Sequence, residues 1–379
     1  MEQRIFSQAV VTPMGLTCGE VVIRDGLIHA VEGRSDPSAN ALDWSGDWLI
    51  PGLVDIHTDN LEKHYQPRPG ALWDSYGAAL AHDAQCAAAG ITTVFDSLSL
   101  HGRKDGLDRQ TSLGPMIAGI DAAQADGVLR ADHLLHLRCE VTNPELLSLL
   151  EAHIANPRLK LLSVMDHTPG QRQTSDVERL KSRQLATGLS AEDVDEFLAV
   201  RHEGRDPDVA QMNRRRVVDI AREYDVPLCA HDDATLEHVE EARDDGCVIA
   251  EFPVTLAAAK AARSFGMAIC MGGPNFVRGS SHSGNLSARE CAEHDVLDIL
   301  ASDYVPLSML RSAFMLIDDF SWTPQKALAT VCAGPARCLG LEDRGEIAVG
   351  QRADLVRVSR RTTGWPVPCE VWRQGRRVA

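Results

Sequence analysis

The sequence lacks the marks of a secreted or membrane-inserted protein. It contains no run of roughly 18 apolar residues, and its first residues, MEQRIFSQAVVTPMG, show no basic segment followed by a long apolar core. We therefore expect neither a membrane span nor a signal peptide. Its ten cysteines form no Cys-x-x-Cys pair, which favours reduced, mostly buried thiols and a cytoplasmic location over disulfides.

Positive charge is also scarce. The chain has 38 lysines and arginines against 54 aspartates and glutamates, a formal net charge of −16. Such a surface repels nucleic acid and anionic membranes, so neither is an expected partner. A small anionic substrate would need a local basic site to overcome that overall field. With 44% apolar and 24% charged residues, the composition is that of an ordinary globular enzyme.

Short apolar runs of β-strand type alternate with helical stretches along most of the 379 residues. This alternation is typical of parallel βα units. The eight runs are 53–57, 92–98, 134–140, 159–165, 227–231, 248–251, 268–271 and 297–302. They predict an α/β fold, a (β/α)8 barrel of the TIM type over residues 51–334, with an open doubly wound sheet as the alternative.

The two chain ends have a different pattern. Residues 1–50 and 335–379 contain short strands separated by turns, without enough helix for barrel units. We expect them to pair into one small β-sandwich domain beside the barrel. A charged stretch at about 168–207 predicts a helical insertion, of the kind that forms lids or interfaces. The sequence leaves open whether the protein is a homo-oligomer.

Ionisable residues stand where several of these strands end, which is where barrels carry their chemistry. They are His57 and Asp59 after the first strand, Glu140 on the third, His167 after the fourth, His231 on the fifth and Asp303 after the eighth. One such residue is usually a hydrogen-bonded structural group. Together they predict a metal site, and six ligands are enough for two ions bridged by a carboxylate.

A resemblance supports this interpretation. Residues 50–57, IPGLVDIH, resemble the first barrel strand of the amidohydrolase superfamily, and the tail from Gly345 to Val356 is similar to that superfamily's return into its β-domain. The motifs HTDNLEKH, MDHTPGQRQ, AHDDAT, AEFP and SDY, with the run from Gly273 to Asn285, resemble the α-D-ribose 1-methylphosphonate 5-triphosphate diphosphatases of the carbon–phosphorus lyase pathway. The resemblance extends from about residue 48 to the C-terminus.

The resemblance implies a hydrolase that cleaves this phosphorylated sugar to the 5-phosphate and pyrophosphate with two divalent ions, zinc or else manganese or iron. The positions of the strand ends decide which ion each side chain could contact. His57, Asp59 and Asp303 would hold one ion, His167 and His231 would hold the other, and Glu140 would lie between the two ions. Asp303 would also hold the attacking water and take its proton. The chain departs from the commonest superfamily pattern: Asp59 replaces a second histidine, Glu140 replaces a modified lysine, and the ligands fall on strands three to five rather than four to six.

Basic residues near the expected mouth are candidate substrate ligands. The loop of residues 278–285 is rich in small residues and contains Arg278, Ser281 and His282, which suit a phosphate. Further candidates are Lys63, His64 and Arg172; an ordinary solvated surface is the alternative for each. We expect Arg138 to hold Glu140 rather than substrate. Hydrolysis of an amide or cyclic amide, or a metal-free barrel that binds a partner, are the competing functions.

Overall fold

Eight parallel strands form a closed barrel. The computed structural model describes residues 2–104, 106–170, 172–174, 177–186, 190–195, 198, 206–281 and 284–379. The barrel strands are β6 (Leu53–Thr58), β7 (Ile91–Ser99), β10 (Asp132–Glu140), β11 (Leu159–Met165), β12 (Leu228–His231), β13 (Ile249–Glu251), β14 (Ala268–Gly272) and β15 (Ile299–Ala301), each paired with its neighbour in this order. Asp303 closes the ring, because its N–H donates to His57 across 2.9 Å and its carbonyl accepts from Asp59 across 2.7 Å. The predicted barrel and its strand numbering are confirmed.

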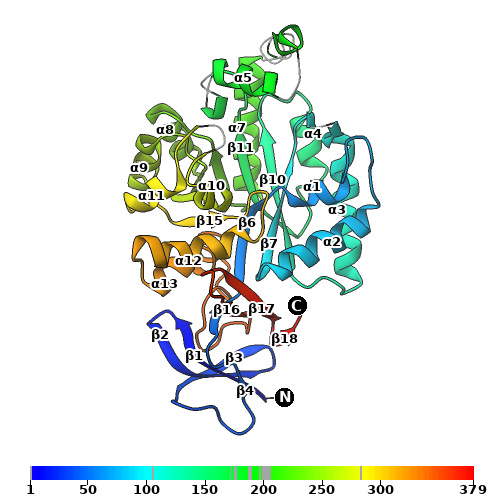
Figure 1. The fold of residues 1–379 in the computed structure, drawn as a ribbon. Coiled ribbons are helices and arrows are strands. Elements are labelled where there is room, and N and C mark those ends of the chain that lie inside the picture. The colour runs from blue at the N-terminus through cyan, green and yellow to red at the C-terminus, as the bar shows by residue number, and fades with distance from the viewer. Residues whose placement is uncertain are drawn as a thin grey trace.

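Helices cover the outside of the barrel (Figure 1). They are α1 (Asn60–Tyr65), α2 (Ser75–Ala88), α3 (Arg109–Ala125), α4 (Leu146–Glu151), α7 (Pro207–Glu223), α8 (Leu236–Asp245), α9 (Leu256–Ser264), α10 (Gly273–Arg278), α11 (Ala288–Glu293), α12 (Ser308–Phe320), α13 (Pro324–Ala329) and α14 (Ala333–Cys338). Side-chain caps fix several starts: Thr235 accepts from the His238 N–H, and Thr255 from the Ala258 N–H. A two-stranded ribbon of β8 (Arg103–Lys104) and β9 (Leu107–Asp108) precedes α3.

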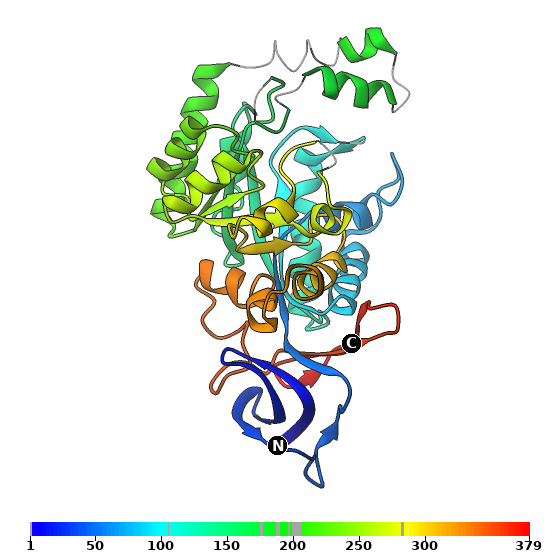
Figure 2. The same ribbon diagram turned by 60° about the vertical axis from the view of Figure 1, so that its left-hand side comes forward.

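Both chain ends contribute to one mixed sheet below the barrel (Figure 2). Its strands are β1 (Glu2–Thr12), β2 (Gly15–Arg24), β3 (Leu27–Gly33), β4 (Leu42–Asp43), β5 (Trp48–Pro51), β16 (Leu355–Arg360), β17 (Pro366–Arg373) and β18 (Arg376–Arg377). Strand β5 joins the halves, since it pairs with β1 on one side and β16 on the other. The predicted fold class is confirmed, and the predicted domain limits, 1–50 and 335–379, stay predictions.

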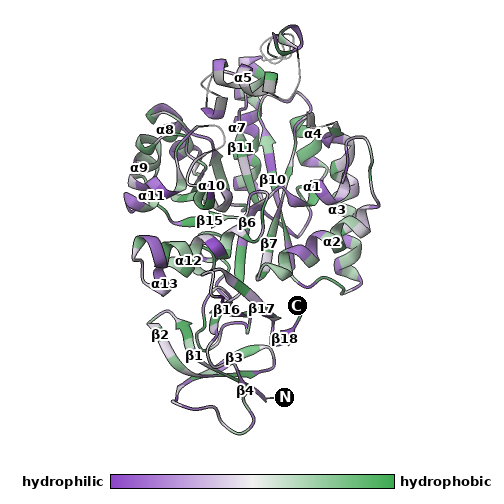
Figure 3. Ribbon diagram, in the orientation of Figure 1, coloured by the Kyte–Doolittle hydropathy of each residue, from purple (hydrophilic) through white to green (hydrophobic). Residues whose placement is uncertain are grey.

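Apolar stretches occur along both the barrel strands and the helices (Figure 3). Their buried residues form two clusters, one on each side of the barrel wall. Val54, Phe95, Leu161 and Ile249 are fully buried and pack in the lower interior of the barrel. A larger cluster packs the outer strand faces against the helices. All ten cysteines are free. The closed and filled bottom leaves the carboxyl ends of the strands as the open end of the barrel.

An arginine cluster ties the chain's end to the bottom of the barrel. Asp132, the first residue of β10, accepts from Arg344 and Arg373 at 2.8 Å each and from Arg352 at 2.5 Å. The three arginines lie just before β16 and at the end of β17, so one barrel carboxylate anchors three points of the C-terminal segment. All four side chains are at least partly buried.

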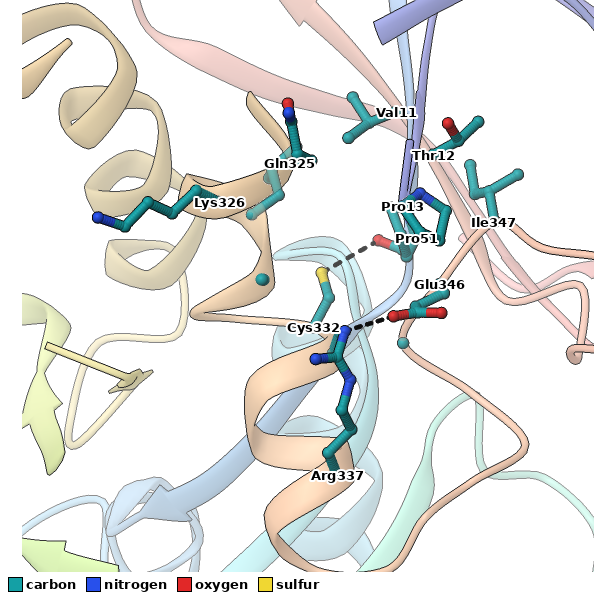
Figure 4. Close-up of a pocket in the computed structure, with 14 residues that line it drawn as sticks. Val11, Thr12, Pro13, Pro51, Gln325, Lys326, Cys332, Arg337, Glu346 and Ile347 are labelled. Atoms are coloured by element: carbon teal, nitrogen blue, oxygen red, sulfur yellow. Dashed lines mark hydrogen bonds and ion pairs between the residues drawn. The ribbon is translucent and has the colours of Figure 1, made fainter. Parts of the chain in front are cut away.

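A pocket of about 220 Å³ lies between the β-domain and the barrel. Pro51, Gln325 and Arg337 are among its lining residues, and Arg337 forms an ion pair with Glu346 (Figure 4). The pocket is at the amino end of β6, so it is separate from the predicted site at the carboxyl ends.

The predicted insertion at 168–207 lies partly outside the described residues. Its described parts include η1 (Arg172–Thr174), α5 (Val177–Ala186) and a helical segment at 191–195. Helix α5 stands at the end of the molecule opposite the β-domain (Figures 1 and 2). Among the described residues, no helix has the length and apolar character needed to span a membrane.

Candidate metal centre and active site

Strained turns mark the open end of the barrel. Asp232, Phe252 and Asp303 have positive φ angles of 59°, 54° and 55°, and each comes within two residues of a barrel strand's last residue. The left-handed region costs a non-glycine residue on the order of 1 kcal/mol or more, and such strain collects where function demands it. All three turns lie at the carboxyl ends of barrel strands, β12, β13 and β15, and two of them carry an aspartate.

One buried carboxylate orients two histidines. The two oxygens of Glu251, at the end of β13, accept from Nδ1 of His57 and Nδ1 of His231, each at 2.6 Å. The imidazole rings stack with centroids 5.8 Å apart. Burial would raise the pKa of Glu251, but His57, His136 and His231 together hold it well below its usual range. Because both Nδ1 atoms are engaged, both Nε2 atoms are left for another partner.

A second carboxylate orients a third histidine. Nδ1 of His167 donates to Glu140 Oε2 across 2.7 Å, and Oε1 accepts from Thr142 and the His167 N–H. Although burial opposes ionisation, His167 lowers the pKa of Glu140 to about 2. Glu140 thus lies on the Nδ1 side of His167, an arrangement that suits an orienting partner; its bridging role between two ions stays a prediction.

The free nitrogens of two histidines meet an unsatisfied carboxylate. Oδ2 of Asp232 lies 3.3 Å from Nε2 of His231 and 3.5 Å from Nε2 of His167. Asp232 is 3% exposed, and among the described residues this oxygen has no hydrogen-bond partner. Ligands about 2.0–2.1 Å from a tetrahedral ion are separated by roughly 3.3 Å. The three atoms therefore have the spacing and the chemistry of a metal site.

A guanidinium occupies the other half of the centre. Arg138, on β10, donates from Nη1 to Asp59 Oδ1 across 2.6 Å, and its Nη2 lies 3.4 Å from His231 Nε2. The nearest approach of His57 Nε2 to Asp59 is 3.7 Å. The expectation that Arg138 holds Glu140 is wrong, because the partner is Asp59: the side chain reaches across the mouth to the first strand's end.

Asp303 is fixed by its backbone at the seam of the barrel. Its peptide group bonds to both sides of Thr58, through His57 and Asp59, and its side chain is half-buried beside Gly272. This places the carboxylate at the mouth, next to the end of β14. Its predicted roles as ligand and base stay predictions.

Two of the predicted substrate ligands lie on α1. Lys63 is exposed, and its Nζ donates to the Tyr304 carbonyl across 2.7 Å. His64 is half-buried, with Nε2 2.9 Å from Gln85 Oε1. Burial lowers the pKa of His64, which disfavours the charged ring.

The other predicted substrate ligands lie on the far side of the mouth. Arg172 is 5% exposed and forms ion pairs with Asp233 and Glu241, so a substrate contact would require those pairs to open. Arg278 is exposed at the end of α10, and Ser281 is half-buried. His282 lies outside the described residues. Of the six candidates, Lys63 and Arg278 are exposed cations.

Sequence reasoning missed two residues of the centre. Glu251 is the only ionisable residue of its short strand, and Asp232 follows His231 directly; both stood in quoted motifs, AEFP and AHDDAT, without a role. Strand alternation would point Asp232 away from His231. Only the left-handed turn at Asp232 brings the two together.

A second buried cluster lies between α2 and the barrel wall. The two oxygens of Asp96 bond to His82 Nε2 at 2.8 Å and to His133 Nδ1 at 2.9 Å. The remaining ring nitrogens contact Asn60 and Asp83. Since each nitrogen already has a partner, this cluster is satisfied as a structural hydrogen-bond network.

Sequence comparisons show which known proteins the chain resembles. The profile described as "Amidohydrolase family" matches residues 48–376. The chain is 42% identical over 367 residues to the α-D-ribose 1-methylphosphonate 5-triphosphate diphosphatase of Escherichia coli K12, covering 95% of this chain and 96% of that protein. It is 26% identical to an imidazolonepropionase of Mesorhizobium japonicum, covering 89% and 85%.

Solved structures share the fold at low identity. An N-acetyl-D-glucosamine-6-phosphate deacetylase from Mycobacterium smegmatis superimposes with a TM-score of 0.67 at 16% identity, covering 100% of both chains. A 5-methylcytosine deaminase from Klebsiella pneumoniae gives 0.67 at 14% identity, covering 100% of this chain and 98% of that one.

Proposed function

This chain belongs to the amidohydrolase family, and from that premise we propose that it is a metal-dependent hydrolase that cleaves α-D-ribose 1-methylphosphonate 5-triphosphate to the 5-phosphate and pyrophosphate. The observation that carries the proposal is 42% identity to a diphosphatase of that name along nearly the whole of both chains. The polar mouth supports it with histidine and carboxylate groups suited to a metal. The proposed setting is the cytoplasm.

The described residues form at least one group fit to hold a metal ion, His167, His231 and Asp232. A bound divalent ion would supply Lewis-acid activation of water and a charge opposite the phosphate oxygens. Zinc suits two imidazoles and a carboxylate, and manganese or iron remain the alternatives. The pair of ions predicted from the sequence requires a second set, for which His57, Asp59 and Asp303 are the candidates.

Asp303 is the proposed base. Its carboxylate would hold the attacking water and take one proton as the oxygen bonds to phosphorus. The bond from that phosphorus to the pyrophosphate oxygen then breaks, and the leaving group departs with its electron pair. The fixed backbone of Asp303 restricts where the water is held, which lowers the entropy cost of the reaction.

Lys63 and Arg278 are the proposed ligands of the polyphosphate, with His64, Ser281 and His282 beside them. Both cations are exposed, so a substrate can reach them without breaking a buried ion pair. They provide the local positive charge that a polyanion needs on a protein of net charge −16. Arg172 joins this set only if it leaves Asp233 and Glu241.

Hydrolysis of a cyclic amide is the second candidate. It is favoured by the 26% identity to an imidazolonepropionase over most of both chains. A neutral amide needs no exposed cations at the mouth, and the likeness to the diphosphatase is stronger and longer. We therefore rank this function second.

One experiment separates the two. Pyrophosphate release from the ribose methylphosphonate triphosphate is measured with and without a chelator, beside hydrolysis of imidazolonepropionate. We expect rapid pyrophosphate release that the chelator abolishes. Hydrolysis of the amide alone would replace the proposal with the second candidate, and full activity in metal-stripped protein would remove the metal from it.

A further inference from the structure

We propose that the Arg138 guanidinium takes the place of a second metal ion, so that the chain holds one ion, at His167, His231 and Asp232. The inference rests on the proposed metal dependence, and it departs from the pair of ions predicted from the sequence. It starts from the unequal way in which the two halves of the centre are built.

Around His231, the side chains of His167, His231 and Asp232 are already placed as ligands for a cation. Asp232 Oδ2 is buried and without a hydrogen-bond partner among the described residues, yet it lies 3.3 and 3.5 Å from two histidine nitrogens. Glu140 and Glu251 engage Nδ1 of the His167 and His231 rings, so that both Nε2 atoms face Asp232. A buried oxygen that no donor satisfies is costly, and an ion ligated here would remove that cost.

Around His57, the positive charge is already supplied by the guanidinium of Arg138. Asp59 Oδ1 accepts a charge-assisted hydrogen bond of 2.6 Å from Arg138. His57 Nε2 lies 3.7 Å from the same oxygen, and in the described part of the chain His57 and Asp59 form no three-ligand group with Asp303. His57 does lie in a group with His136 and Glu251, but both Glu251 oxygens already accept from the Nδ1 atoms of His57 and His231. An ion here would compete with the guanidinium for Asp59 Oδ1, the oxygen that lies 3.7 Å from His57 Nε2.

Charge reinforces this competition. A guanidinium stays protonated at any pH at which the protein is folded, and Arg138 is 8% exposed, so little water screens it. A divalent ion on Asp59 would lie within a few ångströms of that positive charge in a low-dielectric site. Arg138 is on β10, and its hydrogen bond to Asp59 holds the guanidinium at this place.

The consequence is a centre with one exchangeable and one permanent positive charge. Arg138 holds Asp59 in place and faces the same histidine, His231, as the ion does. Arg138 is therefore a positioning residue for the centre. Its role can be tested by measuring the number of bound metal ions, without an activity assay.

The test is metal stoichiometry. Wild type and variants are dialysed against zinc, freed of excess, and analysed for zinc per chain. We expect about one zinc in wild type and in Arg138→Lys, which keeps the charge. Arg138→Met should rise to about two, because Asp59 is released to His57 and Asp303. The matched control is Arg109→Met: Arg109 is 7% exposed and also has one carboxylate partner, Glu62, at 2.7 Å, and it should stay at one.

Two zinc ions in wild type, or a single one in folded Arg138→Met, would overturn the inference. If Arg138→Met does not fold, Asp59→Asn and Asp232→Asn decide: the first should keep its ion and the second lose it, and the reverse result contradicts us. Pyrophosphate release is measured on the same samples. One ion without release refutes the proposed substrate alone, whereas two ions with release refute only the role of Arg138.

Discussion

Nε2 of His231 and Oδ2 of Asp232 lie 3.3 Å apart although the two residues are neighbours in the chain. Neighbouring side chains on a strand point to opposite faces, and the left-handed backbone at Asp232, with φ of 59°, reverses that direction. The end of β12 thus directs two neighbouring side chains, His231 and Asp232, to the same side, although regular strand alternation would allow only one of them to face the site. Several predictions about the metal depend on this turn and on the groups around it.

Asp232→Asn should lower zinc affinity by at least about tenfold, since the anionic oxygen becomes a neutral one while the side chain keeps its shape. Asparagine tolerates a left-handed backbone, so folding should be preserved. Competition with a fluorescent chelator measures the affinity. Asp225→Asn is the control, because Asp225 has a similar φ of 53° but lies in the turn after α7. Equal affinities in both variants would remove Asp232 from the ligand set.

Glu251→Gln should weaken zinc binding by about 10- to 100-fold, the usual effect of losing an orienting partner of histidine ligands. The amide can accept from only one of the two Nδ1 donors, so one ring loses its fixed orientation. The same chelator competition applies. Glu20→Gln, a buried carboxylate of the β-domain, controls for the loss of a buried charge. Unchanged affinity in Glu251→Gln would show that the histidines are held by packing alone.

Asp303→Asn should lower kcat by about two to four decades, the range typical of losing a general base. The fold and most bound metal should survive, because the backbone bonds of Asp303 do not involve its side chain. Initial rates of pyrophosphate release, zinc content and Tm are compared with wild type. Near-normal turnover would move the base to another carboxylate of the mouth.

Arg278→Ala should reduce kcat/KM by about 2–4 kcal/mol, as expected for losing one donor to developing charge. We expect kcat to fall as well as KM to rise, because the leaving pyrophosphate gains charge as its bond breaks. Arg278→Lys should recover only part of the loss, since an ammonium lacks the two-pronged geometry.

Steady-state kinetics on the triphosphate and on a diphosphate analogue provide the measurement for Arg278. Arg376→Ala, an exposed arginine of the β-domain, should behave as wild type. If Arg278→Ala stays within about twofold of wild type, less than about 0.5 kcal/mol, the polyphosphate binds elsewhere, with Lys63 the leading candidate.

His133 should make stability fall at alkaline pH. Burial disfavours the charged ring, but Asp96 and Asp83 raise its pKa from 6.5 to about 9. Its contribution is fully present below about pH 6.5 and is lost as the pH rises through 9, at up to about 1.4 kcal/mol per pH unit for one proton. Urea unfolding from pH 6 to 10 measures it. His133→Gln should flatten this slope relative to wild type; an equal slope in both would assign the dependence to other groups.

The sequence was sufficient to predict the barrel because its signals are local. Each buried strand is a short apolar run in the sequence, and all but the seventh run end in or just before a polar residue, as at Glu140 and His231. The β-domain followed from turns and short strands at both ends. These features depend on residues close in the chain, so periodicity alone could reveal them.

The partners within the centre could not be predicted in the same way. Arg138 and Glu140 share a face of β10, which suggested that they pair, but the long arginine side chain crosses to Asp59, 79 residues away in the chain. Glu251 joins His57 and His231 across three strands. Such pairings depend on barrel tilt and side-chain reach, which no linear pattern encodes.

The attachment of the C-terminal segment to Asp132 has a consequence for biosynthesis. Asp132 stands on the third barrel strand, whereas its partners Arg344, Arg352 and Arg373 are translated more than 200 residues later. While the ribosome still covers those arginines, the nascent barrel exposes an unpaired carboxylate at its base and lacks β16, the partner of β5. Folding of the early half of the chain therefore depends on residues that are translated much later. A polypeptide that stops before Arg344 would lack these contacts, and chaperones and proteases would recognise it as incompletely folded.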